Sequence, residues 1–194
     1  MMVLEDEGAV FLAQTRCATH TMYQLLGDMF GGKRRGHGSH PRPKPQDIDA
    51  EYVFTVVRNP YLRCISEFLQ LREQHNPWMR FSLDDWLDHC TNPCLGLGKK
   101  WGVPQWQLFD RYDIDLAIPI EHLESGLRYL PFWPKWAPTD RIARIGESTY
   151  PQNLYVPARQ MQRIAKIYHK DFELLGYATD WQLGFDTYKL GRLT

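Results

Sequence analysis

The sequence predicts an α/β protein, a single domain over residues 1–194 with a central parallel sheet flanked by helices. Short runs of apolar and β-branched residues alternate along the chain with longer segments in which apolar residues recur at helical spacing. Such alternation is typical of a parallel sheet whose crossover helices cover its faces. A chain of 194 residues is also long enough to bury one substantial core.

The first strand is expected at residues 9–13, an apolar run that suits burial on both faces. Residues 14–21 are small and polar, as in a loop that leads into a helix. Apolar residues at helical spacing predict that helix, and Gly31 with Gly32 should end it. The apolar positions are Met22, Leu25, Leu26, Met29 and Phe30.

A second strand–turn–helix unit follows the first. Residues 52–57 are mostly β-branched and aromatic and form the clearest strand of the chain. Arg58, Asn59 and Pro60 stop the strand, and Pro60 suits the first turn of a helix that runs through Glu73.

The rest of the chain continues the alternation. A third strand is expected at residues 116–120, and a helix at residues 157–172 should end before Gly176. Shorter helices are expected at residues 83–89, 105–111 and 121–130.

Charge and composition exclude several classes of protein. The 23 basic and 23 acidic residues leave no net charge, so no nucleic-acid partner is expected. Residues 1–8 are acidic where a signal peptide is basic, and no apolar run reaches the ~20 residues that span a bilayer. We therefore expect a cytoplasmic protein with no membrane partner. The oligomeric state is left open.

Four cysteines are too few for a disulfide scaffold in a chain of this length. Cys90 and Cys94 lie near His89, which leaves two interpretations, inert buried thiols or part of a zinc site. A complete set of four ligands is not visible, and no metal is expected.

Two loops carry the residues that suit an anionic ligand. Such a ligand binds at the carboxyl ends of parallel strands, against helix N-termini. The first loop, residues 15–21, combines the cation Arg16 with small and hydroxyl residues at the start of a helix. A simple capping turn is the alternative interpretation, since threonine is a good N-cap.

The second loop, residues 58–66, begins with Arg58 at the end of a buried strand, where an unpaired charge is costly. Ser66 follows two helical turns later. A guanidinium and a hydroxyl can hold a terminal phosphate together. The alternative is an ion pair between Arg58 and an acidic side chain.

These two loops and their strands resemble the signature of sulfotransferases that use 3′-phosphoadenosine-5′-phosphosulfate, closest to the carbohydrate (heparan 2-O-like) branch. In that family a Pro-Lys-Thr-Ala-Ser-Thr-Ser-like loop lies between a strand and a helix, and a later strand ends in Arg-Asn-Pro-Tyr-x-Arg-x-x-Ser. The second motif stands here at residues 58–66, and residues 164–177 are similar to the family's closing helix.

The resemblance implies a P-loop-like loop that binds the 5′-phosphosulfate, and a second loop that binds the 3′-phosphate. The donor and its product, 3′,5′-phosphoadenosine, would then be the ligands, without a metal. Arg16 falls where the family has its lysine, and Arg58 with Ser66 matches the 3′-phosphate pair. The first loop would contribute Arg16, Cys17, Ala18, Thr19, His20 and Thr21.

Two positions depart from the family pattern. Arg16 keeps the positive charge of the lysine, but a guanidinium does not readily donate a proton to the leaving phosphate. His20 stands where the family has a small hydroxyl residue, and its role is left open.

The resemblance also places a catalytic base. A Gly-His in the corresponding stretch of the heparan 2-O enzyme supplies the base, which points to His37 here, with His40 as the runner-up. A solvent-exposed loop histidine is the alternative. With Arg16, His37 completes the expected catalytic residues of a sulfotransferase that acts on a hydroxyl of a carbohydrate or small phenolic acceptor.

Two other functions remain as alternatives. A protein on the same fold could bind the nucleotide without catalysis, because of the departures at Arg16 and His20. A nucleotide-dependent phosphotransferase is the second alternative, although the chain has no Gly-Lys-Ser/Thr phosphate loop.

Overall fold

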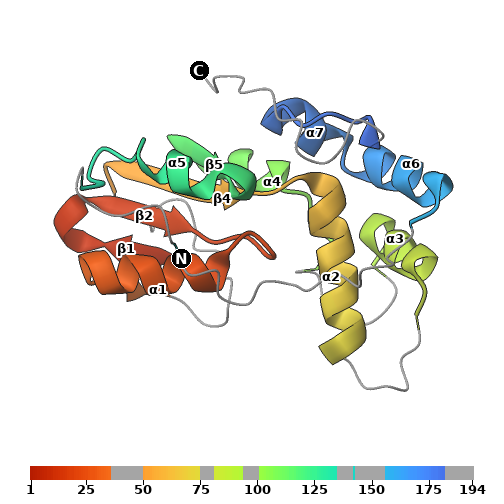
Figure 1. Cartoon of the computed structure of the whole chain (residues 1–194), viewed down its shortest axis with the longest axis horizontal. Helices are drawn as coiled ribbons and strands as arrows, with labels where there is room; N and C mark the ends of the chain where they lie inside the picture. The colour runs from red at the N-terminus through yellow and green to blue at the C-terminus, as the bar shows by residue number, and fades with distance from the viewer. Residues whose placement is uncertain (36–49, 75–80, 94–100, 135–141, 143–155, 182–194) are drawn as a thin grey trace. The chain divides into compact units, whose positions relative to one another are not determined.

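The computed structural model describes residues 1–35, 50–74, 81–93, 101–134, 142 and 156–181. Residue contacts divide the chain into two compact units (Figure 1). The first unit comprises residues 1–58 and 108–147, and the second comprises residues 59–107 and 148–194. The first unit contains the sheet, and the second is helical.

The sheet of the first unit is mixed, in the strand order β3-β1-β2-β4-β5. Strands β2, β4 and β5 are parallel, as the sequence predicts, whereas β1 runs antiparallel to β2 and β3 antiparallel to β1. The predicted all-parallel sheet is therefore wrong at one side. The strand bounds are β1 Met2–Leu4, β2 Ala9–Leu12, β3 Lys33–Arg34, β4 Tyr52–Val57 and β5 Leu116–Pro119.

A tight turn explains the antiparallel strand that the sequence analysis missed. The 3₁₀ turn Glu5–Glu7 joins β1 to β2 and ends at Gly8, which has a left-handed φ of 58°. The Gly8 amide donates to the Glu5 carbonyl at 3.3 Å and closes the turn. A connection this short allows only an antiparallel pair, since a parallel crossover needs a dozen residues or more.

The two faces of the sheet bury different sets of side chains, as the period of two along each strand requires. On one face, Phe11, Phe54 and Ile118 pack in a cluster with residues of helices α1 (Thr19–Phe30) and α5 (Leu123–Leu127). On the other face, Val10 and Leu12 pack with Met1, Val53 and Tyr112. Figure 1 shows α1 and α5 beside the strands.

Helix α1 ends as the sequence predicts. Gly31 adopts a left-handed φ of 61°, and its amide donates to the Gly27 carbonyl at 3.0 Å. Such a C-cap favours glycine because it lacks a Cβ. The predicted helix at 121–130 is shorter, a 3₁₀ segment Ile120–His122 followed by α5.

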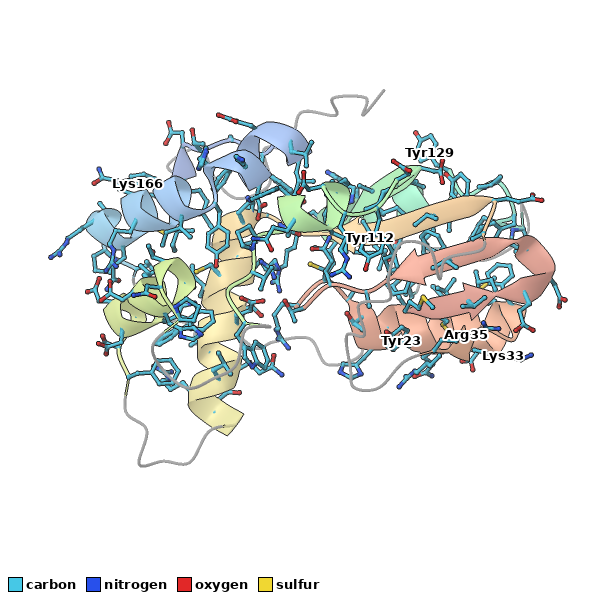
Figure 2. All side chains as sticks on the ribbon, turned by 180° about the vertical axis from the view of Figure 1, so that it is seen from behind. Tyr23, Lys33, Arg35, Tyr112, Tyr129 and Lys166 are labelled. Carbon is cyan, nitrogen blue, oxygen red and sulfur yellow. The ribbon has the colours of Figure 1, made fainter. Side chains whose placement is uncertain are left out.

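The basic residues after α1 are held by side chains of the first unit. Lys33 and Arg35 each pair with Glu5 at 2.8 Å, and the Arg34 guanidinium lies 4.3 Å from the ring centroid of Tyr23. Figure 2 labels Lys33, Arg35 and Tyr23 together at this part of the molecule. Residues 36–44 of the basic stretch lie outside the described residues.

The second unit contains α2 (Pro60–Gln74), α3 (Leu83–Thr91), α6 (Ala158–Ile167) and α7 (His169–Leu175). A single helix is predicted for residues 157–172, but Tyr168 breaks it, with φ −106° and ψ 22°. No proline or glycine marks this break. The short helix α4 (Trp106–Phe109) spans the boundary between the units and is shorter than the predicted 105–111.

Polar contacts fasten α3 in the second unit. Ser82 and Asp85 form a reciprocal capping box at its N-terminus. Arg163 of α6 pairs with both Asp84 and Asp88 of α3. Among the helices in the described part of the chain, none has the length and apolar character needed to cross a membrane.

Candidate functional site

The loop between β2 and α1 closes on its own backbone. The Gln14 carbonyl accepts hydrogen bonds from the Thr19 hydroxyl at 2.7 Å and from the Cys17 amide at 3.4 Å. The Cys17 thiol donates to the Thr15 carbonyl at 3.4 Å. Gln14, Thr15, Cys17 and Thr19 are all buried. The loop is therefore a compact turn with its carbonyls directed to donors of the chain.

Two residues of this loop have left-handed backbones. Arg16 has a φ of 61° and Ala18 a φ of 53°, and they are the two non-glycine residues with positive φ in the described segments. The left-handed region costs an L-residue about 1–2 kcal/mol. Cys17, between them, has no positive φ. Left-handed residues that alternate with right-handed ones form anion-binding nests, in which successive N–H groups line a concavity.

Helix α1 begins directly after the second left-handed residue. Ala18 is its N-cap and makes no side-chain capping bond, and the Met22 amide donates to the Ala18 carbonyl at 2.9 Å. The amides of the first turn precede this bond and have no intrahelical acceptor. Together with the helix dipole they favour a negative charge at this end of α1.

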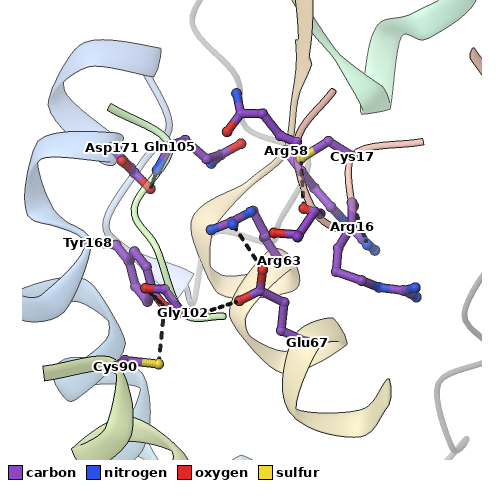
Figure 3. A network of polar contacts seen from close by, with 12 residues as sticks. Arg16, Cys17, Arg58, Arg63, Glu67, Cys90, Gly102, Gln105, Tyr168 and Asp171 are labelled. Carbon is purple, nitrogen blue, oxygen red and sulfur yellow. Dashed lines mark hydrogen bonds and ion pairs between the residues drawn. The ribbon is translucent and has the colours of Figure 1, made fainter. Parts of the chain in front are cut away.

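Arg58 reaches the same loop from the neighbouring strand. Strands β2 and β4 are parallel, with Leu12 opposite Thr55, so their carboxyl ends lie at one edge of the sheet. The Nη1 atom of Arg58 donates to the Arg16 carbonyl oxygen at 3.3 Å (Figure 3). Both arginines are partly buried. Since guanidinium stays charged, two permanent cations come from this turn and the adjacent strand end.

The first unit thus brings together seven of the predicted ligand residues. The Cys17 thiol donates to the Thr15 carbonyl and the Thr19 hydroxyl donates to the Gln14 carbonyl, so both side chains are engaged within the loop. The His20 side chain is exposed. The seven residues are Arg16, Cys17, Ala18, Thr19, His20, Thr21 and Arg58.

The remaining predicted site residues are Ser66, His37 and His40. Ser66 belongs to α2 of the second unit, where it is fully buried. His37 and His40 lie outside the described residues.

Gln14 is a residue of the loop that the sequence analysis did not select. Its carbonyl is the acceptor that closes the turn, and its side-chain Nε2 is buried with no hydrogen-bond partner among the described residues. Buried side-chain amides without a hydrogen-bond partner are rare in folded proteins. The signal in the sequence is a long polar side chain directly after the apolar run that ends at Ala13.

The second unit contains a separate buried polar network (Figure 3). Arg63 and Glu67 form an ion pair at 2.9 Å, with exposed fractions of 3% and 0%, and Glu67 accepts from the Gly102 amide at 3.2 Å. The Tyr168 hydroxyl lies 3.2 Å from the Gly102 carbonyl oxygen and 3.3 Å from Cys90 Sγ. Breaking a buried pair of this kind typically costs about 3–5 kcal/mol.

This network keeps its thiol protonated. Burial raises the pKa of Cys90 far above its ordinary value, and burial likewise raises the pKa of Tyr168. Within the described residues, no group of three or more His, Cys, Asp or Glu side chains could hold a metal ion. Cys94, the other cysteine considered for zinc, is not among those residues.

Comparisons with protein-family models, curated proteins and solved structures found no match to this chain.

Proposed function

We propose that the protein is a sulfotransferase that moves a sulfuryl group from 3′-phosphoadenosine-5′-phosphosulfate to a hydroxyl of a carbohydrate or small phenolic acceptor. The contact between Arg58 and the Arg16 carbonyl carries the proposal. It joins the two motifs that resemble the donor-binding loops of sulfotransferases. The left-handed residues Arg16 and Ala18, and the open start of α1, suit the 5′-phosphosulfate.

In this proposal Arg16 and the amides of the first α1 turn stabilise the charge that develops on the leaving phosphate. A bond forms between the acceptor oxygen and sulfur, while the bond between sulfur and the bridging phosphate oxygen breaks. Because Arg16 holds its proton, it acts through its charge and its hydrogen bonds, without transferring a proton. The products are a sulfate ester and 3′,5′-phosphoadenosine, and the 3′-phosphate is assigned to Arg58.

The acceptor proton is assigned to His37. A histidine has an unperturbed pKa of about 6.5, so its neutral form is available as a base near neutral pH. General-base catalysis contributes typically about 10²–10⁴-fold. This assignment rests on the resemblance.

The proposal is tested by incubating the protein with the donor and a panel of hydroxyl acceptors. We expect a sulfated product and 3′,5′-phosphoadenosine in equal amounts by mass spectrometry. In His37→Ala, turnover should fall by about 10²-fold or more while donor affinity stays nearly unchanged. His40→Ala removes the runner-up base and should keep most of the activity, whereas a loss in His40→Ala with activity kept in His37→Ala assigns the base to His40.

The outcomes separate the alternatives. Unchanged turnover in His37→Ala rejects His37 as the base. Tight binding of 3′,5′-phosphoadenosine without turnover of any acceptor favours a nucleotide-binding protein that has lost catalysis. Transfer that requires Mg²⁺ and a nucleoside triphosphate contradicts the proposal and supports a phosphotransferase.

A further inference from the structure

The peptide plane between Arg16 and Cys17 is held at both of its ends. Its carbonyl oxygen accepts from Arg58 Nη1 at 3.3 Å, and its amide, on Cys17, donates to the Gln14 carbonyl at 3.4 Å. A peptide unit is planar, so fixing both ends fixes the orientation of the whole group. One of the two restraints comes from within the loop, and the other comes from the end of β4.

This plane lies between the two left-handed residues. Arg16, with a φ of 61°, precedes it, and Ala18, with a φ of 53°, follows Cys17. Neither residue is a glycine, so neither adopts this conformation readily on its own. Strained backbone persists where the surroundings over-determine it. The hydrogen bond from Arg58 is one such contact. It holds Arg16, the first of the two left-handed residues.

The Gln14 and Thr15 carbonyls of the turn are engaged by groups close in sequence. Thr19 and Cys17 donate to Gln14, and the Cys17 thiol donates to Thr15. The Arg16 carbonyl instead accepts from a side chain 42 residues away. Arg58 is partly buried, and a charged donor makes a stronger hydrogen bond than a neutral one. The side chain of Arg58 therefore stabilises the backbone conformation of the loop before any ligand is present.

We propose that Arg58 is a positioning residue for the loop at residues 14–18, in addition to any contact with a phosphate. It holds the Arg16–Cys17 peptide in the orientation that presents the amides at the start of α1 to an anion. The identity of that anion, the 5′-phosphosulfate of the donor, rests on the proposed function. Loss of Arg58 then lowers the affinity even for ligands that occupy only the 5′ position and have no 3′-phosphate.

Two nucleotides distinguish positioning from direct contact. Adenosine 5′-phosphosulfate lacks the 3′-phosphate, whereas 3′,5′-phosphoadenosine carries it. If Arg58 contacts only the 3′-phosphate, Arg58→Ala weakens the bisphosphate and leaves the affinity for adenosine 5′-phosphosulfate unchanged. If Arg58 positions the loop, Arg58→Ala weakens both, and we expect about a tenfold loss for adenosine 5′-phosphosulfate by calorimetry.

A second readout needs no ligand. Hydrogen exchange of the Cys17 amide reports the bond to Gln14 directly. We expect this exchange to be about tenfold faster in Arg58→Ala than in the wild-type protein. Arg128→Ala is the matched control, because Arg128 is an exposed arginine at the end of α5 in the same unit. It should change neither the exchange rate nor either affinity.

The outcomes keep the two proposals separate. Wild-type protein that binds neither nucleotide contradicts the proposed function, while faster Cys17 exchange in Arg58→Ala still supports positioning. Unchanged Cys17 exchange overturns positioning, as does an unchanged affinity for adenosine 5′-phosphosulfate in a protein that binds the bisphosphate. If Arg58→Ala does not fold, Arg58→Met is measured. Its side chain keeps the apolar stem but has no N–H to donate to the Arg16 carbonyl, so Cys17 exchange should again exceed the wild-type rate, and an equal rate overturns positioning.

Discussion

Asp171 illustrates how a single buried side chain joins distant parts of the second unit. Its two carboxylate oxygens accept from the Gln105 amide at 2.9 Å and from the Trp106 amide at 2.7 Å. The residue is completely buried. Burial raises the pKa of this carboxyl above its ordinary value of 3.8, although the two amides and Arg63 act in the opposite direction. The pattern of the sequence around 171 predicts a helix but not this role.

We expect Asp171→Asn to destabilise the protein by about 1–3 kcal/mol. An asparagine side chain has one acceptor oxygen, so one of the two amides, on Gln105 or Trp106, is left facing an NH₂ group. The free energy of unfolding of both proteins in urea measures the difference. Equal stability would show that the two amides find other acceptors.

The same pair of proteins tests the pKa. Because the folded pKa is raised, the folded state binds more protons than the unfolded state between 3.8 and the folded pKa. Stability of the wild-type protein relative to Asp171→Asn should therefore rise as the pH falls through the folded pKa toward 3.8. Urea titrations at a series of pH values from neutral to about pH 4 give this difference directly. A relative stability that falls over this range contradicts the raised pKa.

Single residues also show the limits of sequence reasoning at the site. Arg58 is predictable because a charge at the end of a buried strand is costly unless it is paired. Arg16 is predictable as the cation in a loop of small and hydroxyl residues. The left-handed φ of Ala18 is not predictable, since alanine carries no preference for that region. The part played by Gln14 depends on a backbone carbonyl, which every residue possesses.

Among the elements, those with a strong local pattern are predicted within one or two residues. Strand β4 has the predicted bounds, and α2 begins at the predicted Pro60. The exceptions depend on contacts distant in sequence. Strand β1 has three residues and forms through its pairing with β2 and β3, and the break at Tyr168 accompanies a buried hydroxyl that contacts Gly102.

Two helical glycines offer a matched test of packing at this scale. A Cβ at Gly126 of α5 would lie 2.3 Å from Ile118 Cγ2, whereas a Cβ at Gly27 of α1 would meet Met2 Cε at an ordinary 3.5 Å. We expect Gly126→Ala to destabilise by about 1–3 kcal/mol, because α5 must move away from β5. Gly27→Ala should stabilise by about 0.5–1 kcal/mol, since alanine favours a helix.

Denaturant unfolding of the two variants beside the wild-type protein measures both effects. Equal changes in the free energy of unfolding, with the same sign in both variants, would contradict the packing of α5 against Ile118.

In the whole molecule, the parallel register of β2 and β4 is what brings the two predicted motifs together. Local sequence signals place Arg16 in the loop after one strand and Arg58 at the end of another, and the parallel pair then places both strand ends at one edge. The mixed sheet does not disturb this edge, because the antiparallel strands lie beyond β2, on the side away from β4. The α/β class and the meeting of these two loops were thus predictable from local pattern and topology.

Calorimetric titration with 3′,5′-phosphoadenosine tests most directly whether the turn after β2, with Arg58 beside it, is a binding site for a doubly phosphorylated adenosine. We expect saturable binding at one site per chain, at least about tenfold tighter than for adenosine 5′-monophosphate, and a loss of about tenfold or more in Arg16→Ala. Absence of binding, or equal affinity for the two nucleotides, would contradict this account.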